Sequence, residues 1–144
     1  RAAPFADAIG VKLYTMHWPM MLRFYADAVT AGNPGLDRGL VARALAALLA
    51  TGGPEPSSIE DLRYPEPDEP HPVGAAVQAA KIRAAQRAAG SCPVLPFSHA
   101  YGPVEDVAKR AAIAWEAGPH GIWVNRYGYL SDAKLDRLGA LPRG

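Results

Sequence analysis

The sequence predicts an α/β fold with a small parallel sheet, in which each strand is followed by helix. Three apolar stretches, residues 8–15, 92–97 and 121–124, each lead into a polar and aromatic cluster. A segment with helical periodicity follows each cluster. The last two units start about 25–30 residues apart, near the length of one βαβ step. Alternating strands and helices of this kind are typical of parallel sheets.

The first unit begins with residues 8–15, where apolar and polar side chains alternate as in a half-buried strand. Pro19 suits the first turn of a helix, because the missing N–H has no partner there anyway. Apolar residues then recur at three- and four-residue steps, which predicts a helix over 19–31. The sequence Gly-Asn-Pro-Gly at 32–35 ends it.

A second helix is predicted over residues 36–51, with a wide apolar face and Asp37 at its N-terminal dipole. Residues 53–72 contain six prolines and predict one long loop. Ser57 or Ser58 is placed to cap one short turn within that loop. The loop is either a lid over the strand ends or a semi-rigid spacer, and a spacer is the commoner case.

Three further helices and two strands, at 92–97 and 121–124, complete the chain. Residues 73–89 predict a helix with a solvated basic face, which lacks the exposed aromatic residues of a nucleic-acid site. The strand at 92–97 contains two prolines, which is unusual for a central strand. Helices are then expected from Pro103 to about Gly118 and over residues 131–138, where Ser131 is the N-cap.

The bulk composition narrows the function classes. The chain of 144 residues is expected to form one α/β domain or part of one over residues 1–144, and residues 1–7 suggest that a larger domain precedes them. A net charge of +1 argues against a nucleic-acid partner, and no apolar run reaches the about 20 residues of a membrane span. A cytoplasmic protein is expected. The single cysteine, Cys92, rules out an intrachain disulfide and reads as a small buried hydrophobic residue.

Polar and aromatic side chains follow all three predicted strands, and the carboxyl ends of parallel strands meet at one edge of a sheet. His17 and His99 are the candidates for acid–base catalysis. The candidates for substrate binding carry flat rings or hydrogen-bonding tips: Trp18, Tyr101, Asn125, Arg126 and Tyr127. Helix capping or hydrogen bonding at the sheet edge would explain any one of these three clusters. The argument for a functional site is that all three lie at the same edge of the sheet.

Two stretches carry a resemblance to a known class of enzyme. Gly-Ile-Trp-Val-Asn-Arg-Tyr-Gly-Tyr-Leu-Ser-Asp at 121–132, preceded by Pro-Val-Leu-Pro-Phe-Ser-His at 93–99, resembles the last strands of a glycoside-hydrolase-like (β/α)8 barrel. The resemblance implies the C-terminal half of a barrel and a hydrolase acting on a carbohydrate or similar polyhydroxy compound. Two features depart from that pattern: three strands are present instead of eight, and no carboxylate stands at a strand end.

Several alternatives stay open. The alternative to half a barrel is a compact three-stranded α/β sandwich. One alternative function is that of a non-catalytic subunit or interaction module, with the helices at 36–51 and 73–89 as its partner surface. Another is that of a metal-dependent lyase or isomerase that uses both histidines. No phosphate-binding or metal-binding motif is present, so no cofactor and no metal are expected. Because half a barrel exposes strand edges, a second chain that completes the sheet is an expected partner.

Overall fold

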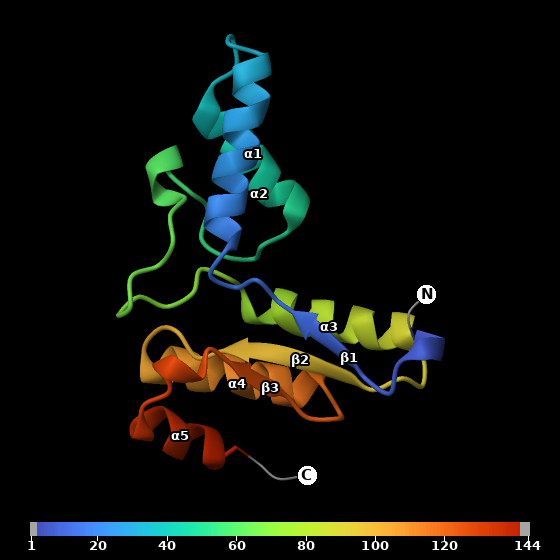
Figure 1. Cartoon of the computed structure of the whole chain (residues 1–144). Helices are drawn as coiled ribbons and strands as arrows, with labels where there is room; N and C mark the ends of the chain where they lie inside the picture. Colours follow the sequence, from blue (N-terminus) through green and yellow to red (C-terminus); the bar gives the residue numbers. More distant parts are fainter. Residues whose placement is uncertain (1–2, 142–144) are drawn as a thin grey trace.

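The computed structural model describes residues 3–141, which form an α/β structure with a three-stranded parallel sheet and five α-helices (Figure 1). This confirms the predicted fold class. The strands are β1 (Ile9–Lys12), β2 (Val94–His99) and β3 (Trp123–Asn125). The helices are α1 (Trp18–Gly32), α2 (Arg38–Leu49), α3 (Ala75–Ala89), α4 (Val104–Ala117) and α5 (Asp132–Gly139).

The order of the strands in the sheet follows the order of the sequence, β1-β2-β3, and both pairs are parallel. The chain passes through α3 before it enters β2 and through α4 before it enters β3. Both steps move across the sheet in the same direction. Because such crossovers are right-handed, α3 and α4 lie on the same face, where they pack against each other and against the sheet.

One face of the sheet is therefore buried and the other is open. On the helix side, Leu13 and Ile82 pack with small residues of α4. On the opposite face Lys12 is exposed, and Trp123 is 49% exposed beside Phe97, at 5.1 Å between ring centroids. A side chain at Gly10 would collide with the Phe97 ring, since its Cβ would lie 2.8 Å away. The glycine leaves room for an aromatic surface on the open face.

Two of the strand predictions were wrong at their ends. β1 stops at Lys12 instead of continuing to residue 15, because Tyr14 adopts a left-handed backbone conformation with φ of 54°. β2 spans Val94–His99 instead of 92–97, so His99 is the last residue of the strand and not part of the following turn.

The central strand accommodates a proline. The N–H of Ala100 donates to the carbonyl of Asn125 in β3. The direction of the backbone groups alternates along a strand, so the backbone nitrogens two and four positions earlier in β2 also point towards β3. The nitrogen of Pro96 is one of them, and Pro96 precedes the first β2–β3 pair, which joins Phe97 to Trp123. The missing N–H therefore falls where β3 has not yet begun, and no ladder hydrogen bond is lost.

The helices agree with the predicted ranges to within two residues, and two predicted N-terminal features are present. The carboxylate of Asp37 accepts a hydrogen bond from the N–H of Leu40 at 2.7 Å, and the Ser131 hydroxyl accepts one from the N–H of Lys134 at 3.4 Å. The wide apolar face of α2 is only partly buried, because Leu48 is 78% exposed. In Figure 1, α1 and α2 form a hairpin that projects away from the sheet.

This hairpin has a small core of its own, to which the Pro-rich loop contributes. The buried residues of that core are Leu22, Ala26, Ala42, Ile59 and Leu62. The predicted short turn in the loop is present as a 3-10 helix, Ile59–Asp61. The carboxylate of Asp61 reaches back and accepts hydrogen bonds from the N–H groups of Ser57 and Ser58, each at 2.9 Å.

The two ends of the Pro-rich loop touch through their backbones. A Cβ on Gly53 would lie 2.0 Å from the carbonyl oxygen of Pro72, and a Cβ on Gly74 would lie 2.3 Å from that of Gly52. The N–H of Gly74 also donates to the carbonyl of Thr51, at 3.3 Å. Only glycine permits so close an approach. The loop is thus closed at its base, and its last residues have a fixed position beside the sheet.

Three smaller expectations concern the ends and surface of the chain. Cys92 is 7% exposed, which confirms that it is buried. Residues Ala3–Phe5 of the N-terminal segment form one 3-10 turn, and Arg1 and Ala2 lie outside the described residues. Within residues 3–141, no helix combines the length and apolar character needed to cross a membrane.

Candidate functional site

The carboxyl ends of the three strands meet in a cluster of histidine and tyrosine rings. His99 ends β2 in register with Asn125, which ends β3. His17 follows the turn after β1, and its ring centroid lies 6.3 Å from that of His99. The structure therefore brings together the two histidines that the sequence singles out as catalytic candidates.

A third histidine, His71, joins this cluster from the end of the Pro-rich loop. Its ring lies 5.8 Å from that of His99, and its Nδ1 lies 2.7 Å from the hydroxyl oxygen of Thr15. Sequence reasoning missed this residue because nothing local distinguishes a histidine between two prolines. The available signal was the loop itself, since loops longer than about 12–15 residues are usually functional or disordered.

Two of these imidazoles are uncharged near neutral pH. His71 and His99 are 6% and 7% exposed. Burial, followed by the charge of Arg110, lowers the pKa of His71 to about 3 and the pKa of His99 to about 4. His17 is half-buried, and burial followed by the charge of Lys12 also lowers its pKa. Neutral imidazoles are suited to exchanging hydrogen bonds with a polar ligand.

Several buried polar atoms of the cluster lack partners. The N–H of Tyr101 donates to Nδ1 of His99 at 3.1 Å, so the neutral ring carries its proton on Nε2. Within residues 3–141, that Nε2 has no hydrogen-bond partner, and neither have Nε2 of His71, Nδ1 of His17 and Oδ1 of Asn125. Because buried polar groups are nearly always hydrogen-bonded, these four atoms need a water molecule or another polar partner that the described protein atoms do not supply.

A buried arginine holds the strand end in place. Arg110 of α4 is 3% exposed and pairs with Asp106 at 2.7 Å. It also donates to the carbonyls of His99 and Tyr101, at 2.7 Å each. Asp106 in turn accepts a hydrogen bond from the backbone N–H of His71 at 3.2 Å. One ion pair therefore fixes both the turn after β2 and the end of the Pro-rich loop.

Tyrosines form the walls of the cluster. Tyr101 packs edge-to-face against Tyr129 at 5.1 Å, and its hydroxyl donates to the carbonyl of Pro65 in the loop at 3.1 Å. Tyr64, also from the loop, packs against His17 at 5.7 Å. The Pro-rich loop therefore supplies one side of the site and contacts the strand ends directly. These contacts place the loop over the strand ends.

The last residue of β3 and the residues that follow it have different positions. Asn125 belongs to the cluster, and Arg126 follows it in a left-handed conformation with φ of 63°. Tyr127 is 85% exposed, so it stands apart from the buried rings. Arg126 directly follows β3, and Tyr14 lies two residues after β1. Both are non-glycine residues with positive φ, as is Ala50 at the end of α2. Backbone strain of this kind is concentrated at functional sites.

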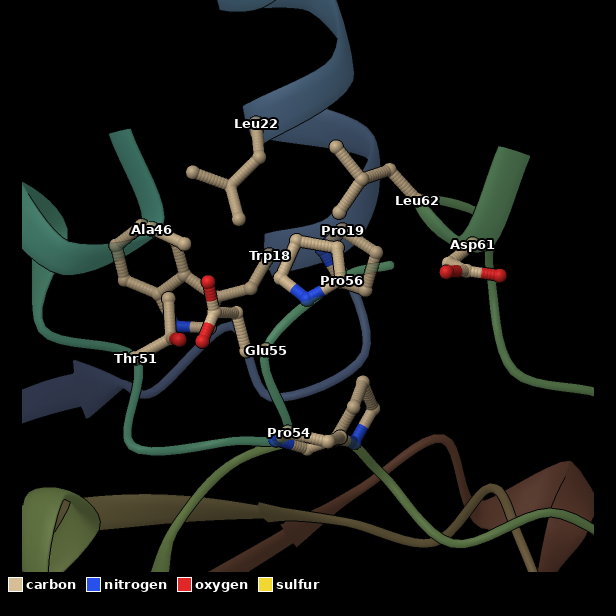
Figure 2. A pocket seen from close by; sticks show the side chains of 11 residues that line it. Trp18, Pro19, Leu22, Ala46, Thr51, Pro54, Glu55, Pro56, Asp61 and Leu62 are labelled. Carbon is tan, nitrogen blue, oxygen red and sulfur yellow. The ribbon is translucent and has the colours of Figure 1, made fainter. Parts of the chain in front are cut away.

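Trp18 lines a cavity of about 200 Å³ between the helical hairpin and the loop, and none of the three histidines lines this cavity. Apolar residues make up most of its lining: Pro19, Leu22, Pro54, Pro56, Leu62 and Pro72. Figure 2 shows the Trp18 indole reaching towards Ala46, Thr51 and Glu55. The ammonium group of Lys81 lies 4.2 Å from the centroid of this ring. The structure therefore separates Trp18 from its chain neighbour, His17.

The chemistry open to the site follows from these groups. Among the described residues, no set of three or more His, Cys, Asp and Glu side chains is placed to hold a metal ion. The cluster offers neutral nitrogen atoms, an amide oxygen and aromatic walls, which suit a ligand rich in hydroxyl groups. Comparison of the chain with family models, with curated proteins and with solved structures gave no match.

Proposed function

We propose that this chain forms the substrate-binding wall of a barrel-type hydrolase acting on a carbohydrate or a similar polyhydroxy compound. Parallel strands in sequence order with helices on one face are the arrangement of successive βα units in a (β/α)8 barrel. Such barrels carry their sites at the carboxyl ends of the strands. The observation that carries the proposal is the set of unpartnered nitrogens on His17, His71 and His99 at that end.

In this proposal the histidines have different roles. His99, with a pKa of about 4, stays neutral and donates from Nε2 to a substrate oxygen. Asn125 accepts a hydrogen bond from a substrate hydroxyl, and the tyrosine rings pack on the sugar face. His17 is the least buried of the three histidines and is the group that accepts a proton during the reaction.

The carboxylates of a glycosidase would have to come from elsewhere. Cleavage of a glycosidic bond needs two carboxyl groups on either side of it. Asp106 is engaged by Arg110 and by the backbone of His71, so it is not free to act on a substrate. Glu66 and Glu69 in the Pro-rich loop are likewise engaged, by Arg63. The acid–base pair would be supplied by another acidic residue of that loop, such as Asp68, or by the remaining part of a larger barrel.

Titration with a panel of neutral oligosaccharides, followed by NMR and calorimetry, tests this function. Replacing His99 by glutamine or Asn125 by alanine should weaken binding at least about tenfold, because each removes a hydrogen bond within a desolvated site. Replacement of the exposed His120 by glutamine is the matched control and should leave affinity unchanged. Failure of every sugar in the panel to bind would contradict the proposal.

A second function, that of an interaction module, is favoured by the open face of the sheet. Among the described strands, β1 and β3 each pair on one side only, and Trp123 stands exposed beside Phe97. A second chain packed on the open face would cover this aromatic surface, and pairing with an edge strand would satisfy its free backbone groups. Light scattering should then show association that Trp123→Lys abolishes and that Phe24→Lys, at a 63% exposed position on α1, does not. A monodisperse, cooperatively melting monomer would count against this function.

A further inference from the structure

We propose that the cavity beside Trp18 binds a small primary amine, whose ammonium group pairs with Glu55 and whose apolar group fills the cavity. This binding site goes beyond the proposed function, because none of the three histidines lines the cavity. The cavity combines a compact apolar interior, hydrogen-bond acceptors on its wall and a loop base that holds those acceptors in place.

The cavity has room for one ring with a short arm. Its volume is about 200 Å³. A cavity of about 150 Å³ is enough to bind benzene, whereas drug-sized ligands occupy about 300–1,000 Å³. Leu22 and Leu62, which are 3% and 4% exposed, form part of its wall, together with the buried Pro19 and Pro56. A small apolar group that enters this space leaves water, which favours binding.

The charged groups on the cavity wall are acidic. Two carboxylates line the cavity, those of Glu55 and Asp61, and within residues 3–141 no Lys, Arg or His side chain lines it. The guanidinium of Arg43 lies 3.9 Å from the carboxylate of Glu55, which is beyond hydrogen-bonding distance, and Arg43 lines a neighbouring hollow instead. Glu55 therefore keeps its acceptor oxygens for a ligand, and the charge of the wall favours a cation.

Thr51 adds a hydroxyl group on the buried part of the wall, where it is 7% exposed. Among residues 3–141, the hydroxyls of Thr15 and Thr30 form hydrogen bonds and that of Thr51 forms none. Nε1 of Trp18 is fully enclosed, whereas the Thr51 oxygen is not. A buried hydroxyl needs a partner, and an ammonium group has three N–H donors to share between Thr51 and Glu55.

The Trp18 ring helps to set the orientation of the ligand. The ammonium of Lys81 lies 4.2 Å from the centroid of this ring, but Lys81 does not line the cavity. Like charges repel, so the ammonium of the ligand is expected to point towards Glu55 and away from Lys81. The part of the indole that lines the cavity then packs against the apolar group of the ligand.

The closed base of the Pro-rich loop holds the two acceptors in place. Thr51 and Glu55 stand on either side of Gly53, where a Cβ would lie only 2.0 Å from the carbonyl oxygen of Pro72. The carbonyl of Thr51 also accepts a hydrogen bond from the N–H of Gly74 at 3.3 Å. Figure 2 shows both acceptors next to the Trp18 indole. A site whose groups are already positioned loses less entropy on binding.

Calorimetric titration with three compounds that share one ring tests the proposal: phenethylamine, 2-phenylethanol and 3-phenylpropionate. The amine is expected to bind about tenfold more tightly than the alcohol at low salt, because its hydrogen bonds are charge-assisted. The carboxylate should bind most weakly, and sodium chloride should reduce the preference for the amine. The indole N–H signal of Trp18 in NMR spectra, identified by its loss in Trp18→Phe, should shift on binding.

Variants locate the ammonium and the apolar group separately. Glu55→Gln should remove the preference for the amine and leave the affinity for the alcohol unchanged. Glu60→Gln, at an exposed position of the 3-10 helix that does not line the cavity, is the matched control and should keep the preference. Ala46→Leu should weaken binding of both compounds, because its larger side chain fills part of the cavity. If Ala46→Leu alters the fold, Glu55→Gln tests the proposal independently.

Two results would overturn the proposal. One is equal binding of the amine and the alcohol, or an amine preference that survives in Glu55→Gln. The other is failure of all three compounds to bind. Neither result bears on the proposed function, which is tested with neutral oligosaccharides and with variants of His99 and Asn125.

Discussion

Arg110→Met is expected to lower the free energy of unfolding by about 3–5 kcal/mol, the usual cost of removing one partner of a buried ion pair. The substitution strands the carboxylate of Asp106, which is 11% exposed, without its counter-ion. It also removes the donors to the carbonyls of His99 and Tyr101. Urea unfolding followed by circular dichroism measures the effect.

The neighbouring position provides the control for this experiment. Lys109 is exposed on the same helix, so Lys109→Met should change stability by no more than about 0.5 kcal/mol. Arg110→Lys should fall in between, because lysine retains the charge but lacks the planar fork that reaches three acceptors at once. A loss of less than about 1 kcal/mol in Arg110→Met would show that the ion pair does not support the strand end.

Acid should destabilise the protein at a pH where its carboxylates are still ionised. The pKa values of His71 and His99 are about 3 and about 4 in the folded chain, below the value of 6.5 for an exposed histidine. The unfolded chain therefore binds more protons in this interval, and stability is complete above pH 6.5 and falls as the pH drops towards the folded values. Between pH 6.5 and pH 5 each histidine should cost about 2 kcal/mol.

Unfolding in urea at pH 7.5, 6 and 5 checks this dependence. His71→Gln and His99→Gln should each remove about half of the loss between pH 6.5 and 5, and His120→Gln, at an exposed position, should remove none of it. A stability that stays constant from pH 7.5 to pH 5 would contradict the burial of two neutral imidazoles. The same series measures each contribution separately, because each variant deletes one titrating group.

Features that depend on neighbours in the sequence were predictable. The helix ranges follow from apolar residues at three- and four-residue spacing, and Asp37 and Ser131 act at the helix N-termini as expected. The side on which the strand-end clusters lie was also predictable, because it follows from parallel strands alone. His17, His99 and Asn125 were brought together for that reason.

Features that depend on tertiary contact were not predictable. Trp18 is one residue beyond His17, but it opens a helix, where successive side chains diverge, and so it packs in the hairpin instead. His71 reaches the site only because the loop returns to its own base. Arg110 has no local sequence signal of burial, and its partner Asp106 lies four residues earlier, a spacing that is equally common in exposed pairs on a helix surface. Its burial depends on the carbonyls of His99 and Tyr101 at the end of β2, which accept its hydrogen bonds.

Because the Pro-rich loop is closed at its base, its tip can change in evolution while the helices and the sheet stay as they are. Because Gly53 and Gly74 pin both ends at one place, residues can be inserted or deleted near the tip, around Pro67, without moving α2 or α3. Such changes would alter which groups cover the histidines while the scaffold beneath them stays constant. Under the proposed function, new ligand preferences would arise by exchanging the loop tip, and a library randomised there tests that expectation.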